Sequence, residues 1–271
     1  MNKQLFLIDV GNSNIVFAGF QNQTKLFSAR RNTRADWSLQ NMQDTMDSIL
    51  KDAKWNPEQL DGILISSVVP ELNPILTSAV QRLSGKKAIL ADAKTIGLTA
   101  QSAVGVDRLL DGLAAYMLYG SPAGNESGGP ILIYDLGTCT TLSIVDVRGN
   151  FLGGQIAAGI DLSLRAEAEF TAQLPRLQPE EAQELIGKDT VSCMLSGAVI
   201  GTAAMIEGIF DRISQESIAA GNGPATLVLT GGLSALVSPW IRCPHHIETD
   251  LLLKGLSLLF YRTVSLEQSA Y

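Results

Sequence analysis

The sequence predicts an α/β protein in which one module occurs twice, giving mixed β-sheets flanked by helices. The first observation is a repeated corner, because IDVGNSNIVFAGF (residues 8–20) and ILIYDLGTCTTLSIV (residues 131–145) both place Asp-x-Gly between two β-branched strands. The second is that each corner leads through another turn into a further strand, at residues 21–30 and 148–157. The third is a later strand, turn and helix in each half, at residues 62–83 and 226–241.

Helices are expected where apolar residues recur with the helical period between these strands. The segments with this pattern are residues 37–53, 108–118, 162–170, 191–218 and 250–261. The stretch GSPAGNESGGP, residues 120–130, is rich in glycine, serine and proline and is typical of a linker or surface loop. We therefore expect a first domain at residues 1–119 and a second at residues 120–271.

Composition favours a soluble cytoplasmic protein. The 271 residues are 46% hydrophobic and 17% charged, which is enough apolar material for large cores without disulfides. Three cysteines far apart in the sequence favour a reducing compartment, and the N-terminus lacks the pattern of a signal peptide. The net charge of −7 disfavours nucleic acid as a partner. The longest uncharged run, Thr190 to Ile206, contains Thr, Ser and Gly throughout, so we expect a buried helix and not a membrane span.

Each corner offers the groups that hold a phosphate and its cation. Asp9 and Asp135 supply carboxylates, and Gly11 and Gly137 supply backbone that can approach a ligand closely. Hydroxyl, amide and N–H donors follow in both copies. A single Asp-x-Gly after a strand is more often just a tight turn, but two copies facing a shared cleft favour nucleotide phosphates. The segment Thr230-Gly231-Gly232 offers a third loop of close approach, whereas the P-loop and dinucleotide fingerprints do not occur.

A second informative segment is VGVDRLLDGLAAY, residues 104–116. Gly105 allows close approach, Asp107 offers a base, and Arg108 offers a cationic fork for a carboxylate or phosphate. On spacing alone the plainer interpretation is favoured, in which Asp107 is a helix N-terminal residue and Arg108 a solvated side chain.

These segments together resemble the type III pantothenate kinases. The resemblance rests on an ordered set of short motifs: Asp9-x-Gly11-Asn12-Ser13, Ser66-Ser67-Val68-Val69-Pro70, Gly105-x-Asp107-Arg108, Asp135-x-Gly137-Thr138-x-Thr140-Thr141, Gly153-Gly154-x-Ile156, Leu174-Pro175-Arg176, Gly187-Lys188-x-Thr190-Val191 and Thr230-Gly231-Gly232. Each motif is short, but their order spans nearly the whole chain.

The resemblance implies an actin-like fold of two ribonuclease-H-like domains, as in the acetate and sugar kinase, Hsp70 and actin (ASKHA) superfamily. It implies transfer of the γ-phosphoryl group of ATP to pantothenate, giving 4′-phosphopantothenate in the first step of coenzyme A biosynthesis. It also implies a homodimer with the substrate site at the interface. The expected cofactors are a divalent cation such as Mg²⁺ and K⁺ or NH₄⁺ as activator.

The same resemblance implies roles for particular residues. Asp107 is the expected general base, and Gly105, Val106, Asp107 and Arg108 are expected to hold pantothenate. Contacts to ATP are expected from Asp9, Val10, Gly11, Asn12, Ser13, Asn14, Ile15, Val16 and Thr138. Asp135 is expected to bind the monovalent cation. Thr190 is expected to reach pantothenate across the dimer interface, and it also suits the N-cap of a helix beginning at Val191.

The sequence departs from the family pattern in places that leave two alternatives open. Residues 96–108, IGLTAQSAVGVDR, lack the Tyr-x-Asn-Pro segment that the family carries before Gly-x-Asp-Arg, and Ala158 stands where the family has proline. Ser13 replaces the commoner threonine but keeps the hydroxyl. One alternative is a nucleotide-binding accessory relative of the Bvg accessory factor kind, which the presence of Asp107 disfavours. The other is an actin-like kinase for a different small hydroxy acid.

Overall fold

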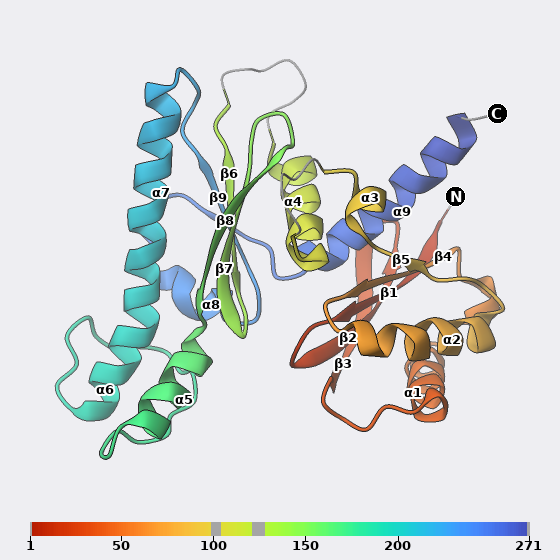
Figure 1. The fold of residues 1–271 in the computed structure, drawn as a ribbon, viewed down its shortest axis with the longest axis horizontal. Helices are drawn as coiled ribbons and strands as arrows, with labels where there is room; N and C mark the ends of the chain where they lie inside the picture. The colour runs from red at the N-terminus through yellow and green to blue at the C-terminus, as the bar shows by residue number, and fades with distance from the viewer. Residues whose placement is uncertain (1, 99–103, 121–127, 270–271) are drawn as a thin grey trace. The chain divides into compact units, whose positions relative to one another are not determined.

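The computed structural model describes residues 2–98, 104–120 and 128–269, which form two compact units. The first unit contains residues 2–98, 104–114 and 252–269, and the second contains residues 115–251 apart from the undescribed stretch. Figure 1 shows the elements of both units along the chain. The expected division between residues 119 and 120 stays a prediction, and residues 121–127 of the expected linker lie outside the described residues.

The first unit is built on a five-stranded sheet of order β3-β2-β1-β4-β5. Its strands are β1 (Gln4–Val10), β2 (Asn14–Gln21), β3 (Thr24–Asn32), β4 (Gly62–Ser67) and β5 (Ile89–Leu90). The first three pair antiparallel, and β1, β4 and β5 run parallel, so the sheet is mixed. Short hairpin turns join β1 to β2 and β2 to β3, as the sequence predicts.

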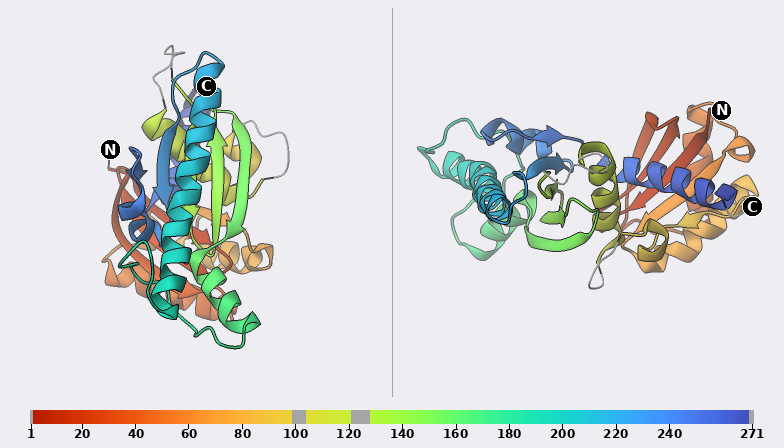
Figure 2. Two further views of the ribbon diagram at one scale, coloured as in Figure 1. Left: turned by 90° about the vertical axis from the view of Figure 1, so that its left-hand side faces the viewer. Right: turned by 90° about the horizontal axis from the view of Figure 1, so that it is seen from above.

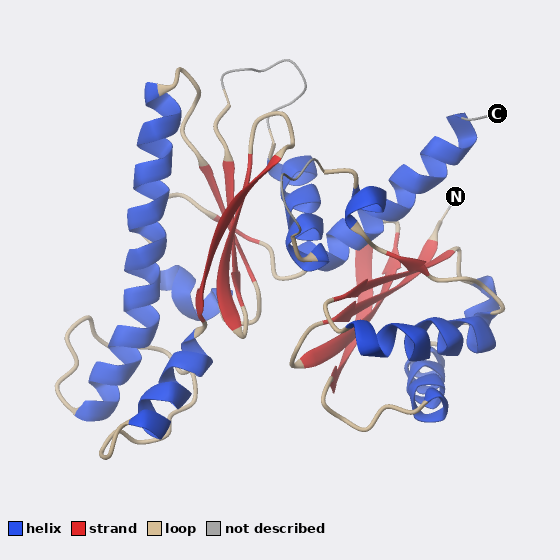
Figure 3. Ribbon diagram, in the orientation of Figure 1, coloured by secondary structure: helices blue, strands red, loops and turns tan. Residues whose placement is uncertain are grey.

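Alternate residues of β1 and β4 face opposite sides of this sheet. Phe6, Ile8 and Val10 join a buried core with side chains of α1 (Leu39–Asp52) and α2 (Asn73–Ser84). The other face meets α9 (Leu251–Ser269), because a Cβ added at Gly62 would lie 2.5 Å from the Phe260 ring. Figure 3 shows α1 and α2 on one side of the sheet and α9 on the other.

Further elements complete the first unit. Residues 106–114 of the helix α4 (Val106–Tyr119) belong to it and pack on α9, since a Cβ added at Gly255 would lie 2.4 Å from the Leu110 carbonyl oxygen. The remaining elements are η1 (Pro57–Gln59), η2 (Pro70–Leu72) and α3 (Ala93–Ile96). The elements β5 and α3 are too short to show a hydrophobic period, so the sequence pattern does not predict them.

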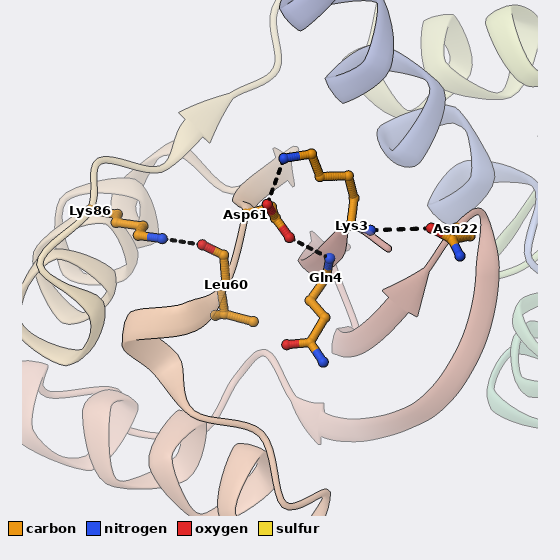
Figure 4. A network of polar contacts seen from close by, with 6 residues as sticks. All are labelled: Lys3, Gln4, Asn22, Leu60, Asp61 and Lys86. Atoms are coloured by element: carbon orange, nitrogen blue, oxygen red, sulfur yellow. Dashed lines mark hydrogen bonds and ion pairs between the residues drawn. The ribbon is translucent and has the colours of Figure 1, made fainter. Parts of the chain in front are cut away.

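A polar network fixes the starts of β1 and β4 relative to each other (Figure 4). The Lys3 ammonium lies 2.7 Å from an Asp61 carboxylate oxygen, and the Gln4 N–H donates to the other oxygen over 2.8 Å. The Lys86 ammonium donates to the Leu60 carbonyl. The pKa of Asp61 is raised by burial, but the bonds from Lys3 and Gln4 and the charges of Lys3 and Lys86 lower it below its ordinary value of 3.8. These bonds hold the register of the two strands whose far ends carry Asp9 and Ser67.

The second unit repeats the topology of the first. Its sheet has the order β10-β9-β6-β7-β8, with antiparallel pairing among the equivalents of β1, β2 and β3 and parallel pairing beyond. Its strands are β6 (Ile131–Leu136), β7 (Cys139–Val145), β8 (Phe151–Ala158), β9 (Thr226–Thr230) and β10 (His246–Ile247). The duplicated mixed α/β module that the sequence predicts is therefore confirmed.

Helices cover this second sheet. They are α5 (Ile160–Phe170), α6 (Thr190–Leu195), the π-helical segment η3 (Ser196–Ile200), α7 (Gly201–Ala219), α8 (Ser234–Val237) and the 3₁₀ turn η4 (Ser238–Trp240). Figure 2 shows α7 running along the sheet, and Ala203 and Ile206 join the buried core with Leu132 and Tyr134 of β6. One helix was expected over residues 191–218; the π turn interrupts it where the Ser196 hydroxyl donates to the Leu185 carbonyl over 2.7 Å.

The expectation that residues 190–206 are buried holds for only one face of this long helix. Met194, Val199, Ile200, Ala203 and Ile206 are buried, whereas Val191 and Met205 are 42% and 36% exposed. Among the described residues, the helix Thr190–Ala219 is the one long and apolar enough to cross a membrane by length and composition. Core helices of soluble proteins pass the same test, and this helix packs along a sheet.

Candidate active site

The first corner is a short turn between β1 and β2 that is tied down from the next strand. The Gly11 N–H donates to the Asn14 carbonyl over 3.0 Å, which closes the turn. Thr33, just after β3, donates its hydroxyl to the Gly11 carbonyl over 2.7 Å and its N–H to the Ser13 carbonyl over 3.0 Å. Thr33 is only 7% exposed. It was not among the residues expected from the sequence, because it lies in no motif and meets the turn only through folding.

The stretch expected to contact ATP divides into exposed turn and buried strand. Asn12 is exposed, and Asp9 and Ser13 are half-buried at the end of the sheet. Val10 and Ile15 are 1% and 0% exposed and belong to the core shared with α1 and α2. Their side chains therefore hold the turn in place from the core, and the residues of this stretch that are open to a ligand are the exposed Asn12 and its half-buried neighbours.

The second corner has the same design in the second unit. Asp135 is half-buried near the end of β6, Thr138 is exposed in the turn, and the Gly137 N–H donates to the Cys139 carbonyl over 3.1 Å. Gly159 donates its N–H to the Thr138 carbonyl over 3.2 Å. A Cβ at position 159 would lie 2.4 Å from that carbonyl oxygen, so the close approach requires glycine.

A third loop lies against the second corner. Gly231 has φ +87° and follows Thr230 at the end of β9. A Cβ at Gly231 would lie 2.3 Å from an Asp135 carboxylate oxygen, so both the backbone conformation and the space call for glycine. The backbone of the Thr230-Gly231-Gly232 segment is therefore in contact with the acid of the corner, as the glycines in the sequence indicate.

The acids of the two corners occupy equivalent positions in the two sheets. Asp9 of β1 pairs in register with Ser66 of β4, and Asp135 of β6 pairs with Thr230 of β9. In each unit the carbonyl of the residue after the acid accepts a hydrogen bond from the loop that follows the neighbouring parallel strand. The Val68 N–H donates to the Val10 carbonyl, and the Leu233 N–H donates to the Leu136 carbonyl, each over 3.0 Å. Both halves thus place a carboxylate, a glycine turn and a hydroxyl at the carboxyl ends of neighbouring parallel strands.

The Gly-x-Asp-Arg motif forms the start of α4 in the first unit. Asp107 lies in the first turn, where a carboxylate interacts favourably with the helix dipole, and its Oδ1 accepts from the Arg108 N–H over 2.8 Å. A Cβ at Gly105 would lie 2.4 Å from the same oxygen. Partial burial lowers the pKa of Arg108, and the charges of Asp107 and Asp111 oppose that shift. Arg108 is therefore a partly desolvated cation beside two acids, not a freely solvated side chain.

Part of the segment before this motif lies outside the described residues. Residues 99–103 belong to the stretch in which the family's Tyr-x-Asn-Pro pattern is missing. The described neighbours are the half-buried Val104 and the exposed Gly105, which lead directly into α4.

Thr190 is the first residue of α6 and is exposed, in the second unit. The interpretation of Thr190 as the N-cap is wrong, because Asp189 takes that position and accepts from the Ser192 N–H over 2.9 Å. The Ser192 side chain in turn accepts from the Asp189 N–H over 3.1 Å, completing a capping box. The hydroxyl of Thr190 therefore has no capping role and is available to a ligand.

The acids of the corners suit a magnesium-nucleotide complex. Among the described residues, no group of three or more His, Cys, Asp or Glu side chains is placed to bind a metal by itself. Mg²⁺ in phosphotransferases is usually held by one or two carboxylates together with substrate phosphates and waters, so it does not need such a group. The half-buried Asp9, next to a turn of N–H and hydroxyl donors, fits that requirement.

Comparisons with known proteins identify the family of this chain. The family model described as type III pantothenate kinase matches residues 5–212. The chain belongs to the type III pantothenate kinase family. The type III pantothenate kinase of Moorella thermoacetica is 33% identical over 268 residues, covering 95% of this chain and 99% of its own length. That of Brevibacillus brevis is 33% identical over 271 residues, covering 96% and 100%.

Solved structures agree with the fold of this type III pantothenate kinase. The ethanolamine utilization protein EutJ from Carboxydothermus hydrogenoformans gives a TM-score of 0.50 at 13% identity, covering 94% of this chain and 89% of its own. A reductive activator for corrinoid, iron-sulfur protein gives 0.53 at 10% identity, covering 98% and 61%. The actin-like fold of two ribonuclease-H-like modules is thus confirmed. Family membership makes the chain a phosphotransferase of coenzyme A biosynthesis, with ATP and pantothenate as substrates and a divalent cation as cofactor.

Proposed function

We propose that this pantothenate kinase uses Asp107 as general base and the turns after Asp9 and Asp135 to hold the nucleotide. The observation that carries the proposal is the duplicated corner: the same acid and glycine turn stands at the same place in two sheets of the same strand order. Each turn is held by a bond from a following residue, Thr33 in one half and Gly159 in the other. Such turns present N–H and hydroxyl donors with little freedom, as phosphate binding requires.

In the proposed reaction the primary hydroxyl oxygen of pantothenate forms a bond to the γ-phosphorus of ATP. The bond from that phosphorus to the bridging oxygen breaks, ADP leaves, and the hydroxyl proton passes to Asp107. Phosphoryl transfer needs in-line positioning and charge neutralisation more than covalent chemistry, so one placed carboxylate is sufficient. Arg108 is proposed to pair with the carboxylate of pantothenate, while Gly105 and Val106 allow close approach beside it.

Two kinds of cation belong to the proposal. A divalent cation neutralises the phosphates when MgATP is bound, and Asp9 is the carboxylate proposed to hold it. Asp135 is proposed to bind K⁺ or NH₄⁺. Support comes from its position, since one carboxylate oxygen lies where the Gly231 backbone approaches closely. Replacing Asp135 with alanine should abolish activation by K⁺, and a variant that still responds normally to KCl would remove this role from Asp135.

A homodimer in the cytoplasm, with the substrate site completed at the interface, is also proposed. Support comes from exposed apolar side chains in the second unit: Leu152, Ile156, Leu162, Phe170, Leu185, Ile186, Val191, Met205 and Ile218. Gly197 and Gly201 lie on the same long helix, and a Cβ added at either would meet nothing within 4 Å. Helix-interior glycine costs about 1 kcal/mol relative to alanine, so packing within one chain does not explain these two. Close approach of a second copy would.

The dimer is tested by a substitution that should stabilise the isolated chain and destabilise the dimer. Gly201→Leu should favour the helix of an isolated chain but push a second copy away, so light scattering should show monomers that unfold no earlier than the wild-type chain. A Gly201→Leu protein that remains dimeric would place the interface elsewhere.

Thr190→Ala should raise the KM for pantothenate with little change in the KM for ATP.

The experiment that tests the activity is detection of 4′-phosphopantothenate by mass spectrometry after incubation with MgATP, KCl and pantothenate. Asp107→Asn should lower product formation by roughly 10²- to 10⁴-fold, the range that general base catalysis contributes, while ATP binding persists. Asp44→Asn is the control, because Asp44 is a carboxylate on α1 whose contact is Gln40 in the same helix. Equal activity in wild type and Asp107→Asn would exclude the base role.

A panel of acceptors separates the proposed function from its alternatives. Release of ADP with pantothenate supports the proposal. Release only with another small hydroxy acid indicates a kinase of different specificity, which the sequence change in residues 96–108 would explain. Nucleotide binding without release of ADP for any acceptor indicates an accessory protein.

A further inference from the structure

Ser66 carries a hydroxyl that folding buries without a partner. The residue is 0% exposed near the carboxyl end of β4, and its Oγ makes no hydrogen bond among the described residues. Buried polar atoms in proteins are nearly always hydrogen-bonded, because leaving one unpaired costs the free energy of its desolvation. Alanine would fill this position without that cost. The hydroxyl therefore calls for an explanation outside the packing of the unliganded chain.

The position of Ser66 relates it to the first corner. In the parallel pairing of β1 with β4, Ser66 stands in register with Asp9. Phe6, Ile8 and Val10 of β1 face the core beneath α1 and α2, as do Ile63 and Ile65 of β4. Successive side chains of a strand point to opposite faces, and Asp9 follows Ile8 as Ser66 follows Ile65. Asp9 and Ser66 therefore share the opposite face of the sheet. Neighbouring strands lie about 4.8 Å apart, so the two side chains are within reach of one hydrogen bond.

The second unit repeats this pairing of an acid with a hydroxyl. Asp135 stands in register with Thr230, which is 4% exposed. The loops after Ser66 and Thr230 both return a backbone N–H to the residue following the acid. A shared role at the two corners explains why a hydroxyl stands beside the acid at both equivalent positions. Packing alone does not explain it, because alanine or valine would fill these positions as well.

We propose that Ser66 is a positioning residue for the nucleotide, whose hydroxyl donates to the Asp9 carboxylate when MgATP is bound. The bond would hold the carboxylate in the orientation in which it faces the magnesium-phosphate group, and it would satisfy the buried hydroxyl in the same step. This inference rests on the proposed function, in which Asp9 serves the metal-phosphate group. It assigns to the Ser66-Ser67 motif a role that the sequence alone does not indicate.

The test compares two substitutions by their effects on unfolding and on binding. Ser66→Ala should leave the ligand-free protein as stable as wild type or more stable, since an unpaired buried hydroxyl is removed. The same change should raise the Kd for MgATP in isothermal titration about tenfold, which corresponds to about 1.4 kcal/mol. The Kd for ATP in the presence of EDTA should stay unchanged, because Asp9 acts through the metal.

Ser257→Ala is the matched control. Ser257 lies on α9 in the same unit, is 1% exposed, and also has no hydrogen-bond partner for its Oγ among the described residues. Its replacement should affect unfolding in the same direction and leave the Kd for MgATP unchanged.

The outcomes distinguish this inference from the proposed function. If wild type binds no MgATP, the proposed function fails. If wild type binds MgATP and Ser66→Ala binds it equally well, the positioning role is wrong while the proposed function stands. A destabilised Ser66→Ala protein with unchanged Kd would show that the hydroxyl serves the fold alone.

Discussion

Thr33→Val is the substitution that best isolates how the first corner is held. Valine keeps the β-branched shape and the backbone bond from residue 33 to Ser13, and it removes the hydroxyl that reaches the Gly11 carbonyl over 2.7 Å. A buried hydrogen bond of this kind contributes about 1 kcal/mol, so the free energy of unfolding should fall by that amount. In the variant the turn would be ordered only when MgATP binds. About 1 kcal/mol of the binding free energy would be used to order it, so the Kd for MgATP should rise about fivefold.

Thr77→Val provides the control for this prediction. Thr77 lies on α2 in the same unit and donates its hydroxyl to the Asn73 carbonyl over 2.8 Å. The two variants lose the same kind of bond, but only Thr33 touches the corner. Urea unfolding and titration with MgATP should give a weaker affinity for Thr33→Val alone. An unchanged Kd for Thr33→Val would refute the idea that this bond preorganises the turn.

Three further predictions follow from single contacts. Gly159→Ala places a methyl 2.4 Å from the Thr138 carbonyl oxygen, so thermal unfolding should show a loss of about 1–3 kcal/mol and ATP should bind more weakly; an unchanged melting temperature would contradict this. Asp61 has a pKa below 3.8 in the folded protein, so its contribution is complete above that value and is lost as the pH falls through the folded pKa. As the pH is lowered, the free energy of unfolding should therefore fall further for wild type than for Asp61→Asn. Parallel plots of this free energy against pH for the two proteins would argue against it. Burial raises the pKa of Tyr134 to about 12, and its hydroxyl has no partner among the described residues, so Tyr134→Phe should stabilise the protein by about 1 kcal/mol in urea; a loss of stability would show that the hydroxyl is satisfied.

The sequence was sufficient for the duplicated architecture because local signals mark its parts. Alternating apolar residues, Asp-x-Gly turns and helical periods identify the β1–β2 and β6–β7 hairpins and the long helices. Two-residue strands such as β5 and β10 carry no period, and they form only because the parallel neighbours β4 and β9 are already in place. The Asp189 cap was missed for a different reason, since Asp and Thr are both good N-caps and stand side by side.

The candidate site was predictable only where chemistry and local turn coincide. Asp9, Asp107 and Asp135 stand in recognisable motifs, but their roles stay proposals until the variants are measured. Thr33 and Gly159 support the corners from later in the chain, so only the folded structure shows them. The face of residues 190–206 that stays exposed was expected to be buried, because an uncharged run indicates apolar contact without saying whether the contact lies in the same chain.

The order in which the chain is made has a consequence for how the first unit matures. Its last helix, α9, is encoded after the whole of the second unit, yet Phe260 covers Gly62 on the sheet face that carries Asp9. During synthesis the earlier strands must wait, with that face uncovered, until the ribosome has released residues 252–269. The second unit can complete itself first, which reverses the usual order in which N-terminal domains fold before later ones.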